Sequence, residues 1–467
     1  MAEETFSVFK STFKGDIVTP TDPDYEAAIA RWACNAQRRA KIVAFVKDEA
    51  DVALAIKYAK TSNLPIAIRG GAHSPAGASS IENGLVIDLS KYINTARVDV
   101  EKKVIHVGGG ALWEAVDKAA IQCGLATVGG TVNHTGVGGL ILGGGYGWLS
   151  PQHGLAVDNL VQATVVTADG SVLTASDTEN PDLFFGIRGG GCNFGVVTEF
   201  VLKLHPQRRT VYAGLLIFAP PALEKLVAVT TEWWAHAGEK EAMLQMTTVG
   251  HDGNPVILIF PFYNGTEAEG RANFKAFLDI GPVADMTKEI PYEELNGIQN
   301  AAVYPGQGIY MKGQAHRTPH FAAISAAYNR VISIVQGPTE HRANIVYEYY
   351  PLAKIMSVPP GTTAFRRDST PTVLVVVSWK ENTVENNDVA RGLAAELGRL
   401  ITAGEKVTES QSLGYSNYDA EAVSGEKESV PDKAKLVFVE NYPRLQGIKK
   451  KYDPENIFNK WFPITPA

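Results

Sequence analysis

Glycine is concentrated in one part of this 467-residue chain. More than half of its 44 glycines lie between Gly70 and Gly195, mostly in clusters of two or three. Glycine loses more conformational entropy on folding than other residues, so such density is expected mainly where backbone contacts backbone or a ligand. The pattern therefore predicts a region of closely packed backbone loops that holds a large, phosphate-bearing cofactor.

The stretch Arg69–Ser74 is the most specific of these loops. It reads Arg-Gly-Gly-Ala-His-Ser and follows the apolar run Leu64–Ile68, which predicts a buried strand ending in a turn. An isolated histidine at His73 would be an ordinary polar loop residue, but the neighbouring glycine clusters favour a role in ligand binding. No G-x-G-x-x-G pattern and no Gly-Lys-Ser/Thr phosphate loop occurs, so neither a Rossmann domain nor an NTPase is supported.

Composition and charge exclude several other classes. The net charge of −7 and the isoelectric point near 5.9, without a basic block, argue against a nucleic-acid partner. No run of 18 apolar residues exists, so we expect no membrane-spanning helix. The N-terminus carries acidic residues and lacks the apolar core of a signal peptide. We expect a cytoplasmic protein for the chain as given, and a secreted one only if a signal was removed.

Nothing in the sequence indicates a metal site. The three cysteines are odd in number and widely spaced, unlike a disulfide framework or a zinc site. His316 and His320 have the spacing of helical metal ligands, but the intervening Pro319 and the lack of a nearby acidic ligand favour a loop. We therefore expect a protein that acts on a small molecule without a metal.

Residues 41–206 alternate short apolar runs with amphipathic segments. We expect strands at 41–46, 84–89, 103–107 and 196–204, helices at 51–60, 112–123 and 181–186, and a hairpin over 160–175. After residue 210 the glycine clusters end, and apolar strands at 212–218, 256–262, 345–350 and 373–379 alternate with helices near 220–237, 266–278 and 385–401. The second pattern predicts a broad, largely antiparallel sheet with helices over one face.

Several motifs, taken together and in order, resemble the FAD domain of the vanillyl-alcohol oxidase superfamily. They are Arg69–Ser74, Val86–Leu89, Thr131–Gly147, His153–Asn159 and Ile187–Phe200. The end of the chain, Asn441–Leu445 and Lys451–Phe458, is similar to the C-terminal segment of the berberine-bridge-enzyme-like branch. The resemblance covers nearly the whole chain.

The resemblance implies an α+β fold in which a PCMH-type FAD-binding domain is formed by both chain ends. Residues 1–206 would be its first part, and residues 410–467 the berberine-bridge-like segment that returns to it. Residues 207–409 would form a substrate domain, with a large antiparallel sheet flanked by helices, over the flavin.

A covalent bond from His73 to the 8α-methyl group of FAD is implied by the same resemblance. Many relatives have a second tether, a cysteine at the position of Val132, and valine cannot form that bond. The chain is therefore expected to hold FAD through His73 alone. Leu140, where many members with two tethers have a histidine, is more like the 6-hydroxy-D-nicotine oxidase subgroup.

Further cofactor contacts are implied along the matching motifs. They are Arg69, Gly70, Gly71, Ala72, Ser74, Gly130, Thr131, His134, Thr135, Gly136, Gly138, Gly139, Gly143, Gly144, Tyr146, Gly147, His153, Gly154, Asp158, Asn159, Gly195, Val196, Val197, Asn456 and Phe458. His134 could hydrogen-bond the flavin or the substrate, or only cap its loop. Thr135 stands where many members have an apolar residue associated with oxygen access, so the resemblance leaves oxidase and dehydrogenase behaviour open.

Two groups of tyrosines are candidates for the chemistry. Gly414–Tyr418 matches a family motif whose last tyrosine often deprotonates the substrate, which makes Tyr418 the candidate base and Tyr415 its assistant. A packing pair of aromatic rings is the alternative. Tyr347 and Tyr349 share one face of a predicted strand and would line the substrate pocket if that face meets the flavin, or pack in the core if it does not. No acid is evident in the next strand, Thr372–Val377, so we expect a less polar pocket than in some plant relatives.

The resemblance thus implies an FAD-dependent oxidoreductase that takes a hydride from a CH–OH or CH–NH group of a small organic substrate. We expect O2 to reoxidise the reduced flavin and to yield H2O2, with a dehydrogenase that uses another acceptor as the alternative. A flavin-binding protein without redox turnover is the alternative from another class. A monomer is plausible, and the sequence does not identify the substrate.

Overall fold

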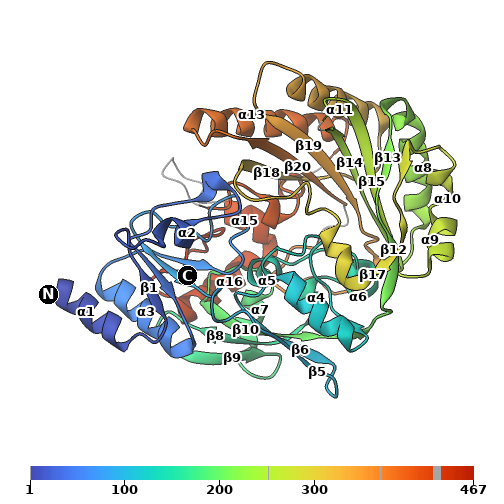
Figure 1. The fold of residues 1–467 in the computed structure, drawn as a ribbon. Helices are drawn as coiled ribbons and strands as arrows, with labels where there is room; N and C mark the ends of the chain where they lie inside the picture. The colour runs from blue at the N-terminus through green and yellow to red at the C-terminus, as the bar shows by residue number, and fades with distance from the viewer. Residues whose placement is uncertain (1, 251, 368–370, 407, 424–432) are drawn as a thin grey trace.

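The computed structural model describes residues 2–250, 252–367, 371–406, 408–423 and 433–467. These residues form a mixed fold of helices and sheets, which confirms the predicted α+β class. Figure 1 shows a part that carries both termini and, above it, a second part built on one broad sheet. None of the helices within the described ranges combines the length and the apolar character that crossing a membrane requires.

The terminal part begins with a four-stranded sheet in the order β1-β2-β4-β3. Its strands are β1 (Asp16–Val18), β2 (Ile42–Phe45), β3 (Ile66–Arg69) and β4 (Leu85–Asp88), and its helices are α1 (Ala2–Thr12), α2 (Tyr25–Ile29) and α3 (Glu49–Thr61), with the 3-10 turn η1 (Cys34–Ala36). β2 and β3 both pair with β4 in parallel, and β4 is wholly buried. Helix α3 buries its apolar face, as the sequence predicts, and begins where the Asp48 side chain accepts a hydrogen bond from the Asp51 backbone N–H.

An antiparallel sheet in the order β5-β6-β10-β8-β9 follows. Its strands are β5 (Ala96–Asp99), β6 (Val104–Gly108), β8 (Leu160–Val166), β9 (Val172–Ser176) and β10 (Val196–Lys203); a two-stranded sheet joins β7 (Leu125–Ala126) to β11 (His205–Pro206). The helical segments here are α4 (Trp113–Gln122), α5 (Val137–Leu142), α6 (Ser150–His153), η2 (Ala156–Asn159) and α7 (Pro181–Ile187). The predicted hairpin of β8 and β9 is confirmed. Its turn is closed by the Asp169 carboxylate, which accepts hydrogen bonds from Thr167 and Ser171.

The broad sheet has nine strands, and all its pairs are antiparallel. Its strands are β12 (Thr210–Ala213), β13 (Leu216–Phe218), β14 (Glu241–Val249), β15 (Pro255–Tyr263), β16 (Ala284–Asp285), β17 (Lys288–Pro291), β18 (Gly308–Ala315), β19 (Arg342–Tyr349) and β20 (Thr372–Trp379). The path runs β16-β13-β15-β14-β19-β20-β18, while β12 pairs with β15 and β17.

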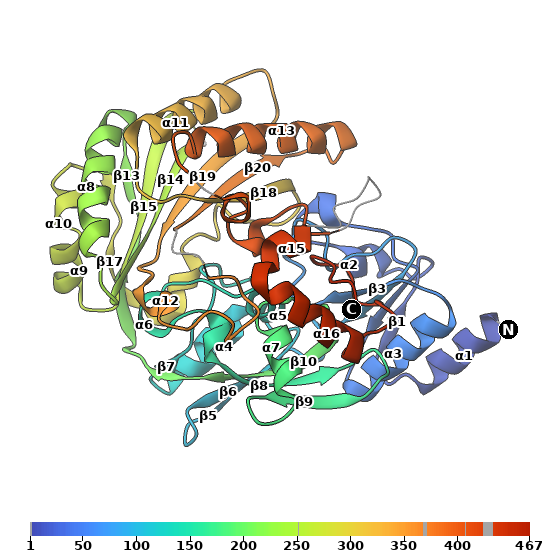
Figure 2. The same ribbon diagram turned by 180° about the vertical axis from the view of Figure 1, so that it is seen from behind.

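Helices cover one face of this sheet, as predicted, and Figures 1 and 2 show them on the side away from the terminal part. They are α8 (Leu223–His236), α9 (Glu267–Asn273), α10 (Lys275–Leu278), α11 (Phe321–Val335) and α13 (Val384–Ile401); η3 (Pro220–Ala222), η4 (Tyr292–Gly297) and α12 (Ala353–Met356) lie in connections. The sequence missed β14, β18 and α11. It also predicted one strand over 212–218, which is wrong because the backbone breaks at Gly214, with φ +145°, where a Cβ would lie 2.4 Å from the Met286 carbonyl oxygen.

The C-terminal segment packs against the terminal part, as Figure 2 shows. It contains α14 (Glu409–Ser412), η5 (Ser416–Tyr418), α15 (Lys433–Phe438), η6 (Val439–Asn441) and α16 (Tyr442–Tyr452). The buried Lys449 ammonium fixes it, because it donates to the Asn193 carbonyl at 2.8 Å and to the Asp453 carboxylate at 2.5 Å. Residues 424–432 of this segment lie outside the described residues, and the domain limits at 206 and 409 stay a prediction.

Candidate functional site

A large cavity lies where the glycine loops meet the uncovered face of the broad sheet. Its volume is about 1140 Å³, above the roughly 300–1,000 Å³ that is usual for a single small-ligand pocket. The floor consists of the loops around residues 70–75, 130–143 and 191–197, and the roof consists of side chains from β13, β14, β15, β18, β19 and β20. The cavity therefore has room for a cofactor and a substrate together.

Close backbone contact explains the glycines of the floor. A Cβ on Gly71 would lie 2.4 Å from the Cα of Gly136, so the two loops can meet only without side chains. Gly139 differs, because a Cβ there would meet no protein atom within 4 Å and would project from the cavity wall. The floor thus presents bare backbone to the cavity, as a cofactor held by close approach requires.

His73 lines this cavity, in the turn that follows β3. Its ring stacks on Trp32 at 4.2 Å between centroids, and its Nε2 lies 3.2 Å from Nδ1 of His134. Burial and, to a smaller extent, the nearby His134 lower the pKa of His73 to about 3, so its imidazole is neutral at neutral pH.

His134 is held from its other side. Its Nε2 lies 2.8 Å from the Val303 carbonyl oxygen, which can only accept a hydrogen bond. Nε2 of His134 therefore carries the proton, and its Nδ1 accepts a hydrogen bond from Nε2 of His73. In this arrangement Nδ1 of His73 keeps a free lone pair. His134 does not line the cavity itself. Its hydrogen bond instead sets the tautomer of His73, a role that the sequence did not predict.

Tyr418 reaches the cavity from the C-terminal segment and donates a hydrogen bond of 2.8 Å to Oε1 of Glu348 on β19. Both side chains line the cavity, and Glu348 is 4% exposed. Burial raises the pKa of Glu348 to about 8 and the pKa of Tyr418 well above its usual value. Among the described residues, Oε2 of Glu348 has no hydrogen-bond partner. A buried carboxylate oxygen without a partner among these residues is therefore left beside the cavity.

Tyr415 is tied to the glycine floor. Its hydroxyl accepts hydrogen bonds from the Gly145 backbone N–H at 2.9 Å and from the Asn417 side chain at 2.7 Å. Asn417 in turn fills the space beside Gly143, where a Cβ would lie 2.1 Å from its Oδ1. The ring of Tyr415 meets that of Tyr418 edge-on, with 4.9 Å between centroids. These contacts favour a positioning role for Tyr415.

Of the two alternatives for Tyr347 and Tyr349, the structure shows packing in the core and not the pocket. Both side chains point to the helix-covered face, where Tyr347 meets His316 and Tyr349 meets Trp234. Because side chains alternate along β19, the side chain of Glu348, which lies between them, points to the cavity. The strand Thr372–Val377 carries no acid, as noted from the sequence, but the cavity does have a carboxylate, which stands on β19. A lone acid within an apolar, aromatic run was the signal that could have revealed Glu348.

The remaining predicted cofactor contacts divide by position. Those that line the cavity are Gly70, Gly71, Ala72, Ser74, Gly130, Thr131, Thr135, Gly136, Gly138, Gly139, Gly143, Tyr146, Gly195 and Val197. Arg69, Gly144, Gly147, Val196, Asn456 and Phe458 are not in the cavity wall. Arg69 instead forms an ion pair of 2.6 Å with the buried Asp88, and Val196 and Phe458 belong to the core around α3.

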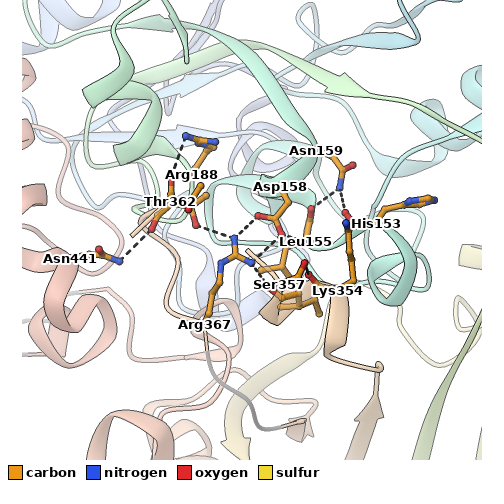
Figure 3. Close-up of polar contacts among 12 residues, drawn as sticks. His153, Leu155, Asp158, Asn159, Arg188, Lys354, Ser357, Thr362, Arg367 and Asn441 are labelled. Atoms are coloured by element: carbon orange, nitrogen blue, oxygen red, sulfur yellow. Dashed lines mark hydrogen bonds and ion pairs between the residues drawn. The ribbon is translucent and has the colours of Figure 1, made fainter. Parts of the chain in front are cut away.

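The motif His153–Asn159 also lies away from the cavity wall, contrary to expectation. Figure 3 shows that Asp158 faces Arg367, with which it forms a buried ion pair; Arg367 also donates to the Ile355 carbonyl at 3.0 Å. Asn159 donates to the carbonyl oxygens of His153 and Leu155. The motif therefore joins the terminal part to the segment between β19 and β20.

Comparison with known proteins agrees with this geometry. Residues 40–176 match the model of an FAD binding domain, and residues 414–464 match the berberine and berberine-like model. The FAD-linked oxidoreductase pgmH of Aspergillus terreus is 34% identical over 100% of this chain and 97% of its own. The (R)-6-hydroxynicotine oxidase of Paenarthrobacter nicotinovorans is 30% identical over 97% of both chains.

Solved structures of oxidases also match this chain over nearly its whole length. The 6-hydroxy-D-nicotine oxidase from Arthrobacter nicotinovorans superposes with a TM-score of 0.87 at 27% identity, and the match covers 97% of this chain and 98% of the other. Glucooligosaccharide oxidase from Acremonium strictum, described with a 6-S-cysteinyl, 8α-N1-histidyl FAD, gives a TM-score of 0.85 at 20% identity over 99% of both chains. At that identity the second match shows the shared fold alone.

Proposed function

The chain belongs to the family of FAD-linked oxidoreductases with a berberine-like C-terminal segment, and from this premise we propose that it is an oxidase of small organic alcohols or amines. FAD, when bound, supplies the acceptor for a hydride from a CH–OH or CH–NH group and passes the two electrons to O2, which yields H2O2. The observation that carries this proposal is the hydrogen-bonded pair of Tyr418 and Glu348 at the cavity wall.

The pair provides a path for the proton that the substrate loses. A carbon that gives up a hydride leaves a cation, which is neutralised when the adjacent O–H or N–H proton departs. Burial raises the pKa of Tyr418, so its phenolate is not available at neutral pH. Tyr418 can accept the substrate proton only while its own proton moves to Oε1 of Glu348. A carboxylate whose pKa is about 8 suits this task near neutral pH.

His73 is the proposed single tether of FAD. The neutral ring and the free lone pair at Nδ1 fit a nucleophile that forms a bond to the flavin. Val132, which also lines the cavity, has no atom that could form a second tether. Acid-precipitated protein should therefore stay yellow. Free flavin in the acid supernatant would contradict the tether.

Anaerobic mixing of the purified protein with a panel of alcohols and amines tests the function. Bleaching of the flavin absorbance by a member of the panel, followed by peroxide release when air is admitted, is the expected result. A dehydrogenase would instead bleach, react slowly with air and react fast with a quinone. A flavin that no member of the panel bleaches would favour a binding protein without redox turnover.

A further inference from the structure

The side chains in the roof of the cavity indicate which class of substrate fits there, which the pair of Tyr418 and Glu348 does not. Alternation along each strand turns every second side chain of the broad sheet toward the cavity. Cross-strand register then arranges these side chains in rows. The row next to the catalytic pair runs across four strands as Leu258, Met246, Val346 and Leu374, and all four line the cavity.

This row contains no polar side chain. With adjacent strands about 4.8 Å apart, four strands give an apolar band roughly 14 Å long. In the next row outward, Thr248 and Asn344 hydrogen-bond to each other, so their polar groups are partly satisfied without a ligand. The polar side chains of these strands thus flank the apolar row: Glu348 lies on its inner side, and Thr248, Asn344 and Arg342 lie on its outer side.

A molecule that lies along the band loses water from the surface it presents there. Hydroxyl groups on that surface would be desolvated without hydrogen-bond partners, a cost that apolar carbon does not carry. An oligosaccharide has hydroxyls along its whole length, whereas a ring system has apolar faces. The flexible Met246 thioether adapts to such a face.

We infer that the substrate is a largely apolar, aromatic alcohol or amine, with its reacting carbon near Tyr418 and Glu348 and its ring system against the row of Leu258, Met246, Val346 and Leu374. This inference rests on the proposed function, because it concerns the substrate of the same site. A carbohydrate is therefore not the expected substrate, although the chain shares its fold with sugar oxidases.

Binding is measured apart from turnover with the FAD-loaded protein under anaerobic conditions. The probe is 2-methylnaphthalene, which lacks a group to oxidise, and the readout is the change in flavin absorbance. Met246→Gln replaces the thioether by an amide of similar length, so it should weaken binding about tenfold or more. Met286→Gln is the matched control, since Met286 is 62% exposed and outside the cavity wall. Leu374→Asn is the second variant, to be used if Met246→Gln folds poorly. It should weaken probe binding to a similar extent.

Turnover is then compared for 2-naphthalenemethanol and cellobiose. We expect the naphthalene alcohol to reduce the flavin and cellobiose neither to bind nor to reduce it. Reduction by cellobiose would overturn the substrate class while supporting the oxidase function. Unchanged probe binding in both Met246→Gln and Leu374→Asn would also overturn it. Probe binding that the two variants weaken, without flavin reduction by any alcohol or amine, would support the apolar site and contradict the oxidase function.

Discussion

Replacing Glu348 by glutamine is the sharpest test of the proton path, because the carboxylate and its amide have nearly the same shape. Glutamine keeps an oxygen for the Tyr418 hydrogen bond but cannot take up a proton. A general base typically contributes a factor of about 10²–10⁴, so flavin reduction should slow by that order when the wild-type carboxylate is fully ionised.

The pKa of Glu348 sets how this effect depends on pH. With a pKa of about 8, roughly one tenth of the carboxyl groups are ionised at pH 7 and nearly all at pH 9.5. Because the ionised form is the active one, wild-type reduction should rise about tenfold from pH 6 to pH 7 and about fivefold from pH 7 to pH 8, and then level off. The Glu348→Gln rate should not depend on this ionisation, so the ratio of the two rates should be about tenfold larger at pH 9.5 than at pH 7.

Anaerobic stopped-flow measurement of flavin bleaching, from pH 6 to pH 10 with a confirmed substrate, gives both rates. Glu232→Gln is the matched control, since Glu232 is an exposed carboxylate on α8, outside the cavity wall. It should reduce at the wild-type rate throughout. A Glu348→Gln variant as fast as wild type at pH 9.5, or a wild-type rate that is flat between pH 6 and pH 9, would refute the assignment.

Other variants test the tether, the fold and the oxygen reaction. His73→Ala should release all flavin on acid precipitation, and His134→Ala should lower the covalently bound fraction while FAD still binds; an undiminished fraction would exclude tautomer control by His134. Asp158→Asn leaves Arg367 buried beside a neutral partner and should destabilise the protein by about 3–5 kcal/mol, read as a lower melting temperature. The pair Asp158→Leu with Arg367→Met should recover most of that loss, and a melting temperature no higher than that of Asp158→Asn would argue against the ion pair. Thr135→Val should speed reoxidation by O2 if the hydroxyl limits oxygen access, and an unchanged stopped-flow rate would exclude that role.

Local patterns predicted much of this fold. The apolar face of α3, the hairpin of β8 and β9 and the turn that holds His73 depend on residues that are close in sequence. Periods of 3.6 and two residues are enough to find such elements.

Long-range partners could not be predicted in the same way. Alternation places Tyr347 and Tyr349 on one face of β19, but which face meets the helices depends on α11 and β14, which the sequence analysis missed. Arg367 is 209 residues from Asp158, and no local pattern pairs them. The pairing of Glu348 with Tyr418 was unpredictable for the same reason, since the two residues are 70 apart in the sequence.

The alternation of the broad sheet also separates two kinds of evolutionary change. Side chains such as Tyr347 and Val375 pack against the helices, while their immediate neighbours Val346 and Leu374 line the cavity on the other face and also pack in the core that contains Trp148. Mutations on the helix-covered face act mainly on the stability of the protein, whereas mutations on the cavity face also alter which substrates it accepts. A lineage can therefore change its substrate range one roof residue at a time on an unchanged scaffold, and a library confined to the cavity-facing positions should yield mostly folded variants.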